Sequence, residues 1–398
     1  RVTLSRLTIC FFAIALANCI VQITTQSITF SMSAEGKDIV ADIIDGSEIQ
    51  RGFSVVYNDT MNICDGIPHQ SGTTCTTVPK WMPEDRSVSL NPLVNQSGIL
   101  QGFNVTGLSG NLSSTTLSVG CVQSLTWLES FLRDAKSEDI VHIIFQGWLF
   151  TLSLVALFAG SIPHLIVVLA SHALNTGWAG FRVYTNSIAK ATYQRVIVQG
   201  TCGGIDILGG WREDHMRYAV RRLPFGLNSV SSNLMPVYSK ETIGSVGPSP
   251  AVSRIYKMTL WLNVCLQFAT FFTMTSAAIW FDKLRTDIMP SLANNKLYAA
   301  AFYLTAVFLL PWFLLGSISV RREHRVMFLG FMCISVFPLV IGGAWFASAL
   351  FRYEFLDWTF FAAVTTMSDV FLLVTCVLAV VCRVHFGRGL AHFRSYIS

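Results

Sequence analysis

Six long apolar runs, five without a charged residue and one with a single aspartate, constrain the fold of this chain more than any other feature. A helix needs about 20 mostly apolar residues to cross the ~30 Å hydrocarbon core of a bilayer. The runs are Leu7–Phe30, Ile143–Ala170, Met258–Phe281, Tyr298–Val320, Val326–Leu350 and Phe360–Cys382. The whole chain is 52% hydrophobic and only 13% charged, which excludes an ordinary soluble domain. The sequence therefore predicts a membrane α-helical bundle with six transmembrane helices.

The first run has a second interpretation. It begins "RVTLSRLTICFFAIALA", with basic residues, a short apolar stretch and an Ala-x-Ala ending, which is the pattern of a signal peptide. The apolar character continues past Ala17 through "CIVQI". This continuation favours a first transmembrane helix at 1–30, with a cleaved signal peptide as the alternative.

The loops on the two sides of six spans differ in charge. The segment 31–141 has 6 Lys and Arg against 13 Asp and Glu, whereas 173–257 has 10 against 4. The turn 321–325 has 3 against 1, and the tail 383–398 has 3 against none. Basic loops stay in the cytoplasm. We therefore predict an extracellular 31–141, a second span at 142–172, a cytoplasmic loop at 173–257, four more spans in 258–382, and both termini inside.

Glycosylation acceptors agree with that orientation. The Asn-x-Ser/Thr sequence marks a surface loop of a protein in the secretory pathway. Four such acceptors lie in 31–141, at Asn58, Asn95, Asn104 and Asn111. They predict N-linked glycans and a location in the plasma membrane.

The segment 31–141 is long enough for a small domain with its own core. "GFNVTG" and "TLSVGC" alternate apolar and polar residues, and "DIVADIID" and "FSVVY" are further strand candidates. "VQSLTWLESFLRD" has apolar residues at helical spacing. A break at "KSED" follows, where Ser137 is a candidate N-cap for the second span. We expect a β-rich α+β domain between the first two spans.

Three cysteines of this domain face an oxidising compartment, where disulfides form. They are Cys64, Cys75 and Cys121. Cys64 with Cys75 closes a short loop, and either of them with Cys121 ties the early strands to the late ones. The spacing does not choose among these pairings. The third thiol is either buried and reduced or part of a bridge to another chain.

Polar residues inside the predicted spans are the candidates for chemistry. Asp369 lies nine residues into the sixth span, and Gln267 and Asn263 share a face of the third span. With His164 of the second span they form an inward-facing polar seam if these spans are neighbours. The seam is interpreted either as a conduction or proton path or as hydrogen bonds that fasten helices together, and the second interpretation is preferred.

The inner end of the last span carries one further candidate and one resemblance. Cys382 precedes Arg383 at the membrane boundary, which makes it a candidate for S-acylation. The sequence "CRVHFGRGL" resembles the end of a large group of multi-span membrane proteins of mushroom-forming fungi. In that group a Cys-Arg and a Phe-Gly-Lys/Arg-Gly-Leu motif follow the last span. The resemblance covers barely a dozen residues and implies no activity.

The sequence motifs limit the possible classes of function. No Ser-His-Asp, His-Glu-x-x-His or Cys-x-x-Cys pattern is recognised, so we expect neither an enzyme nor a cofactor. The first hypothesis is a glycosylated plasma-membrane interaction protein that contacts its own copies or another membrane protein and no nucleic acid. The second is a channel or transporter that uses the seam around Asp369, and the third is an accessory subunit of a membrane enzyme.

Overall fold

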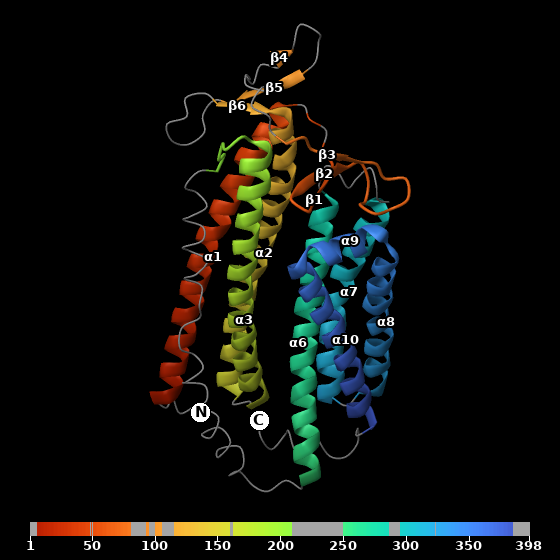
Figure 1. Cartoon of the computed structure of the whole chain (residues 1–398). Coiled ribbons are helices and arrows are strands. Elements are labelled where there is room, and N and C mark those ends of the chain that lie inside the picture. The colour runs from red at the N-terminus through yellow and green to blue at the C-terminus, as the bar shows by residue number, and fades with distance from the viewer. Residues whose placement is uncertain are drawn as a thin grey trace. The chain divides into compact units, whose positions relative to one another are not determined.

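The structure is a computed structural model, and it describes residues 6–47, 49, 51–80, 93–94, 100–105, 115–159, 162–208, 250–285, 295–322 and 324–384. Its contacts divide the chain into two compact units, whose elements are labelled in Figure 1. The sheet-bearing unit consists of Ile20–Gln146 and Leu174–Pro224. The helical unit consists of Arg1–Cys19, Gly147–Ala173 and Phe225–Ser398.

The first helix is much longer than a single span. Helix α1 runs without interruption over Arg6–Gly46. The strand expected in "DIVADIID" is therefore wrong. Val40, Ile43 and Ile44 are buried in the core of the sheet-bearing unit, and their i, i+3, i+4 spacing places them on one face of a helix.

The predicted second span has different bounds from 143–170, because two helices share this apolar run. Helix α2 covers Val119–Ala159 and helix α3 covers Ile162–Thr192. A bridge joins Cys121 to Cys202 near one end, and Arg182 contacts Glu138 further along. From Cys121 to Glu138 the residue numbers on α2 rise, whereas those of their partners fall from Cys202 to Arg182. Helices α2 and α3 are therefore antiparallel.

Local sequence explains where α3 begins and why α2 does not break earlier. Pro163 is the second residue of α3, where the missing N–H of proline costs no helical hydrogen bond. The expected break at "KSED" is absent, since α2 passes through Ser137 without interruption. The two acidic residues that follow Ser137 are paired with Arg182 inside the unit.

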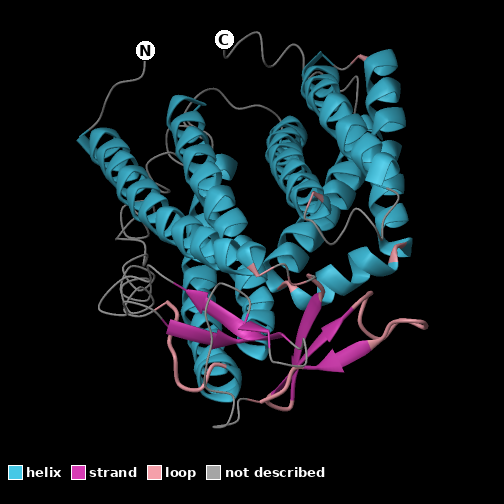
Figure 2. Cartoon of the chain, turned by 90° about the horizontal axis from the view of Figure 1, so that it is seen from above, coloured by secondary structure: helices cyan, strands magenta, loops and turns pink. Residues whose placement is uncertain are grey.

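The strands of the sheet-bearing unit form two antiparallel sheets of three strands (Figure 2). The first has β1 Phe53–Tyr57, β2 Thr60–Cys64 and β3 Cys75–Thr77 in that order. The second has β4 Leu93–Val94, β5 Leu100–Val105 and β6 Thr115–Ser118. Asn58 and Asp59 join β1 to β2 with φ of 48° and 58°. Positive φ at both residues is the signature of a two-residue type I′ hairpin turn.

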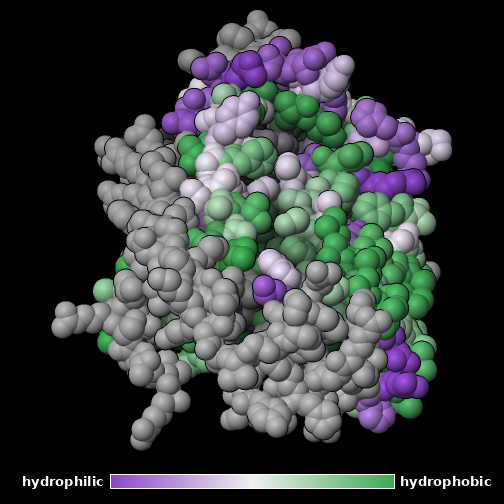
Figure 3. All heavy atoms as spheres, turned by 90° about the horizontal axis from the view of Figure 1, so that it is seen from below, coloured by the Kyte–Doolittle hydropathy of each residue, from purple (hydrophilic) through white to green (hydrophobic). Residues whose placement is uncertain are grey.

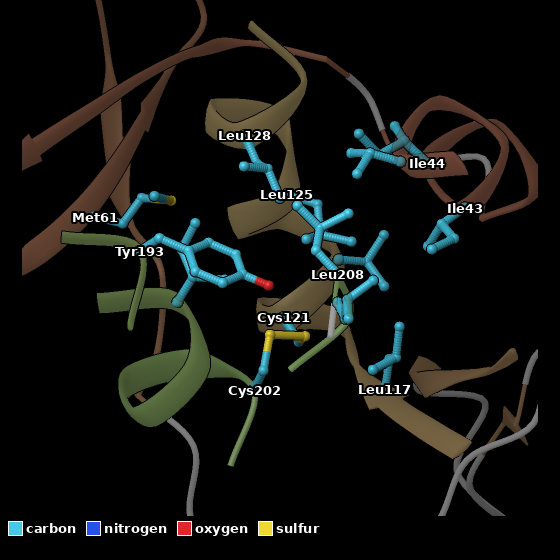
Figure 4. Close-up of a cluster of buried hydrophobic side chains, with 14 of the residues drawn as sticks. Ile43, Ile44, Met61, Leu117, Cys121, Leu125, Leu128, Tyr193, Cys202 and Leu208 are labelled. Atoms are coloured by element: carbon cyan, nitrogen blue, oxygen red, sulfur yellow. A yellow bond between two sulfur atoms is a disulfide. The ribbon is translucent and has the colours of Figure 1, made fainter. Parts of the chain in front are cut away.

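One hydrophobic core joins segments that lie far apart in the sequence (Figure 4). Met61 of β2, Leu125 of α2 and Tyr193 of the π-helical segment η1 (Tyr193–Thr201) are each at most 1% exposed. Leu208 belongs to the same core. Residues 174–208 were expected in a cytoplasmic loop, across the membrane from 31–141. The structure packs residues of this segment in one core with residues of 31–141.

The described part of the helical unit contains five further helices. They are α6 Pro250–Leu284, α7 Asn295–Arg322, α8 Arg325–Ala347, α9 Ala349–Asp357 and α10 Thr359–Val384. Four of them match the last four predicted spans, and α9 is a short connection that takes up the end of the run expected to reach Leu350. Gly316 permits close packing of α7 on α8, because a Cβ there would lie 2.7 Å from a ring carbon of Phe331.

Six helices in the described part of the chain are long and apolar enough to cross a membrane. They are α1, α2, α6, α7, α8 and α10. Large apolar side chains cover their outer faces, for example Val307, Leu329 and Val377, each at least 60% exposed. Figure 3 shows hydrophobic residues as a broad green surface on one side of the view. Exposed apolar surface of this extent is suited to lipid and not to water.

Candidate functional site

In the described part of the chain, each unit contains a group of polar side chains where helices meet. In the sheet-bearing unit, charged residues of α2 and α3 meet polar residues of α1, and we name this group the charged clamp. Its members are Gln26, Ser33, Glu138, Asp139, Trp178 and Arg182. In the helical unit, hydroxyl groups of α6 and α10 meet Asp369 at a small cavity.

Arg182 is the centre of the charged clamp. Its Nε lies 2.8 Å from Oε1 of Glu138, and its Nη1 lies 3.0 Å from Oδ1 of Asp139. All three residues are at most 7% exposed. The guanidinium presents several N–H donors in a fixed plane and can therefore bind two carboxylates at once, which a lysine does less well.

The two carboxylates of the clamp have further donors. Gln26 of α1 donates to Oδ1 of Asp139 at 2.5 Å, and Ser33 donates to Oδ2 at 3.4 Å. The indole N–H of Trp178 donates to Oε1 of Glu138 at 2.9 Å. Buried charges are tolerated when they are paired and hydrogen-bonded. The clamp therefore fastens three helices together.

The cavity at Asp369 has a volume of about 20 Å³ and is lined by residues of α6, α8, α9 and α10. Two hydroxyl pairs border it, Thr273 with Ser368 and Ser276 with Thr365, each at 2.8 Å. A space of this size holds about one water molecule. The cavity thus provides a polar environment for Asp369.

The predicted polar seam is not assembled as expected. The hydroxyl pairs set the register of α6 against α10. Thr273 is hydrogen-bonded to Ser368, so it lies at about the same height along the helices as the next residue, Asp369. Gln267 lies six residues from Thr273, about 9 Å along the helix, and Asn263 lies a further turn away. His164 is buried on α3, beside the cluster of Leu165 with residues of α1 and α2. The structure therefore gives Asp369 hydroxyl neighbours in place of the predicted amides.

A second buried ion pair lies at the end of α6. Nζ of Lys283 is 3.1 Å from Oε2 of Glu354 in α9 and 5.1 Å from the ring centre of Trp358. Lys283 and Glu354 are at most 7% exposed. Burial raises the pKa of the neighbouring Asp357 carboxyl, and the charge of Glu354 raises it further. These contacts fix α9 onto the end of the helical unit.

The structure pairs the cysteines of the sheet-bearing unit. Cys64 bonds to Cys75 and Cys121 bonds to Cys202. Cys202 was missed, because charge counting assigned its segment to the cytoplasm, where thiols stay reduced. Arg182 was missed for the same reason. Its only signal in the sequence was a lone charge in an otherwise uncharged stretch.

The remaining predicted residues fall in different places. Asn58 is exposed at the β1–β2 turn, and Asn104 lies on β5. Asn95 and Asn111 lie outside the described residues, as does the tail 385–398. Cys382 is only 3% exposed and packs in the core of the helical unit, so its sulfur is not accessible to an acyltransferase in this structure.

The fold and these sites define a multi-pass α-helical membrane protein with a disulfide-bonded unit that contains two small sheets. Within the described residues, no group of three or more His, Cys, Asp or Glu side chains is arranged to hold a metal ion. Comparison with known proteins finds no matching family model, no similar curated protein and no similar solved structure.

Proposed function

We propose that this chain is a glycosylated plasma-membrane protein whose sheet-bearing unit lies outside the cell. That unit recognises a binding partner, which is another membrane protein or a second copy of the chain, and the transmembrane helices anchor it. Catalysis has no part in this function.

The observation that carries the proposal is the distribution of the cysteines. All four disulfide-bonded cysteines belong to the sheet-bearing unit. The free cysteines of the described chain are all on long apolar helices; they are Cys10, Cys19, Cys265, Cys333, Cys376 and Cys382. Disulfides persist in oxidising compartments and are rare in the cytosol. This distribution supports an extracellular position for the sheet-bearing unit.

The position of Asn58 supports glycosylation. It stands at the tip of a hairpin with its side chain exposed, and Thr60 completes the Asn-x-Thr sequence. An exposed turn is accessible to the transferase, and a glycan there is compatible with the folded sheet.

The internal links of the sheet-bearing unit support a role in recognition. Two disulfides, the charged clamp and a shared core hold its segments in one arrangement. A preorganised surface loses less conformational entropy when it binds a partner.

The test examines the full-length protein in its native host cells. Peptide N-glycosidase should increase the electrophoretic mobility of the wild-type chain, and Asn58→Gln should reduce that shift by one glycan. A membrane-impermeant, amine-reactive biotin reagent should label this protein on intact cells. A crosslinker should capture the protein as a dimer or in a complex of defined mass. A chain without glycans whose Cys64 and Cys202 are alkylated as free thiols in the cell would contradict the proposal.

A channel or transporter is the second candidate, and the cavity at Asp369 is the observation in its favour. The test is solute or proton flux in reconstituted vesicles, compared between wild type and Asp369→Asn. Flux that depends on Asp369 would support transport. If both proteins are equally impermeable, transport is excluded for the solutes tested and the recognition function is retained.

A further inference from the structure

We propose that α3 is a transmembrane helix that returns the chain across the bilayer beside α2. Cys121 and Cys202 then lie on one side, and the α2–α3 turn lies on the other. This inference concerns which segments share a side, and it is independent of the proposal that the sheet-bearing unit is extracellular.

Beyond the charged clamp, α2 and α3 are each long enough to cross a bilayer. From Asp139, where α2 is paired with α3, α2 continues for 20 uncharged residues to Ala159. From Ile162 to Phe181, just before Arg182, α3 also has 20 uncharged residues. At 1.5 Å per residue each stretch is about 30 Å long, which matches the hydrocarbon thickness of a bilayer. Two antiparallel helices of this length cross the membrane together.

The distribution of polar side chains on α3 carries the second step. His164, His172 and Asn175 are at most 9% exposed, whereas Leu174 is 59% exposed. A helix that faces water shows the reverse pattern, with polar residues outside and leucine inside. Buried polar residues with exposed apolar ones are typical of a helix surrounded by lipid.

The same distribution explains why α3 does not stand out by its hydropathy. Its average is lowered by the two histidines and the asparagine, because an average counts every residue equally. These side chains face neighbouring helices, so the surface that meets the lipid is more apolar than the average suggests.

The residues around Arg182 mark the membrane boundary. Trp178, Phe181 and Tyr184 lie within one turn of it on α3, and Phe181 and Tyr184 are 38% and 63% exposed. Aromatic residues concentrate at the interface between lipid and water. The charged clamp thus lies where the chain leaves the hydrocarbon, which reduces the cost of placing charges in the protein interior.

The consequence is that the sheet-bearing unit is assembled from two separate parts of the chain. Its first part follows α1, and its second part, Leu174–Leu208, arrives only after the chain has crossed the bilayer and returned. Three helices then anchor this unit. Arg182 and Arg195 belong to the sheet-bearing unit. Their charges are therefore not evidence that 173–257 is a cytoplasmic loop.

Cysteine labelling of the full chain tests the proposal. The six free cysteines are replaced by serine, and single cysteines are introduced as Tyr57→Cys on β1, Arg195→Cys on η1 and Phe158→Cys near the turn. These positions are 67%, 61% and 74% exposed, the second value referring to the side chain. A membrane-impermeant maleimide is applied to cells before and after permeabilisation. Only variants that retain the Cys121–Cys202 bridge on non-reducing gels are scored.

The expected result is that Tyr57→Cys and Arg195→Cys react from the same side, and that Phe158→Cys does not react from that side. Reaction of Arg195→Cys from the side opposite to Tyr57→Cys would overturn the inference, and so would reaction of all three from one side. If the first two react together but only after permeabilisation, the inference is supported and the extracellular function proposed above is rejected. The two proposals therefore fail separately.

Discussion

Replacement of Arg182 by methionine tests the energetic role of the charged clamp. The change removes the cation from two carboxylates that are at most 7% exposed, Glu138 and Asp139. Breaking a buried ion pair by deleting one partner costs about 3–5 kcal/mol, because the remaining charge is left uncompensated. We expect Arg182→Met to lower the free energy of unfolding by this amount. Arg182→Lys should cost less, since lysine keeps the charge but binds one carboxylate well.

The matched control is Arg195→Met, in the same unit. Arg195 also pairs with a carboxylate, at 3.0 Å from Asp59, but their side chains are 61% and 52% exposed. Exposed pairs contribute about 0–1 kcal/mol. Thermal unfolding of the purified proteins in nanodiscs, followed by protease resistance of the sheet-bearing unit, measures both changes. Equal losses for Arg182→Met and Arg195→Met would refute the reasoning, and restoration of stability by Glu138→Gln with Asp139→Asn would confirm that unpaired charge is the cause.

Three further predictions concern packing, covalent links and pH. Gly316→Leu should destabilise the helical unit by about 1–3 kcal/mol in thermal unfolding, because its side chain would overlap the ring of Phe331. Cys202→Ser should lower the stability of the sheet-bearing unit by about 2–5 kcal/mol, measured by protease resistance, because it opens a bridge between residues 81 apart. Hydrogen bonds from Thr74 lower the pKa of the Asp65 carboxyl. Their contribution is complete above the ordinary Asp pKa and is lost as the pH falls through the lowered value. The protection factors of amides in 65–74, which are corrected for the intrinsic pH dependence of exchange, should therefore fall on acidification in wild type and not in Asp65→Asn.

The predicted spans that the structure confirms are those for which lipid leaves few alternatives. A long uncharged run has to satisfy its backbone hydrogen bonds internally, so it forms a helix. The runs that became α6, α7, α8 and α10 were identified in this way. Helical spacing also placed Leu125, Leu128 and Leu132 correctly on one buried face.

The errors have different physical causes. The run 143–170 is long enough for one crossing, and an apolar composition contains no signal for the point at which two antiparallel helices reverse. "DIVADIID" has the residue types of a strand, but burial of Val40 and Ile44 in the core that also contains residues of α2 and η1 favours a helix. The pairing of Cys202 and Arg182 with α2 depends on contacts between residues more than 40 positions apart, which local patterns do not report.

The two disulfides differ in their exposure to solvent, and this difference gives the sheet-bearing unit a graded response to thiols. Cys121 and Cys202 are at most 2% exposed, whereas Cys75 is exposed on β3. Thiol exchange requires access of the attacking thiolate to sulfur. A mild reductant would therefore release the loop 65–74 first and leave the two halves of the unit tethered to each other.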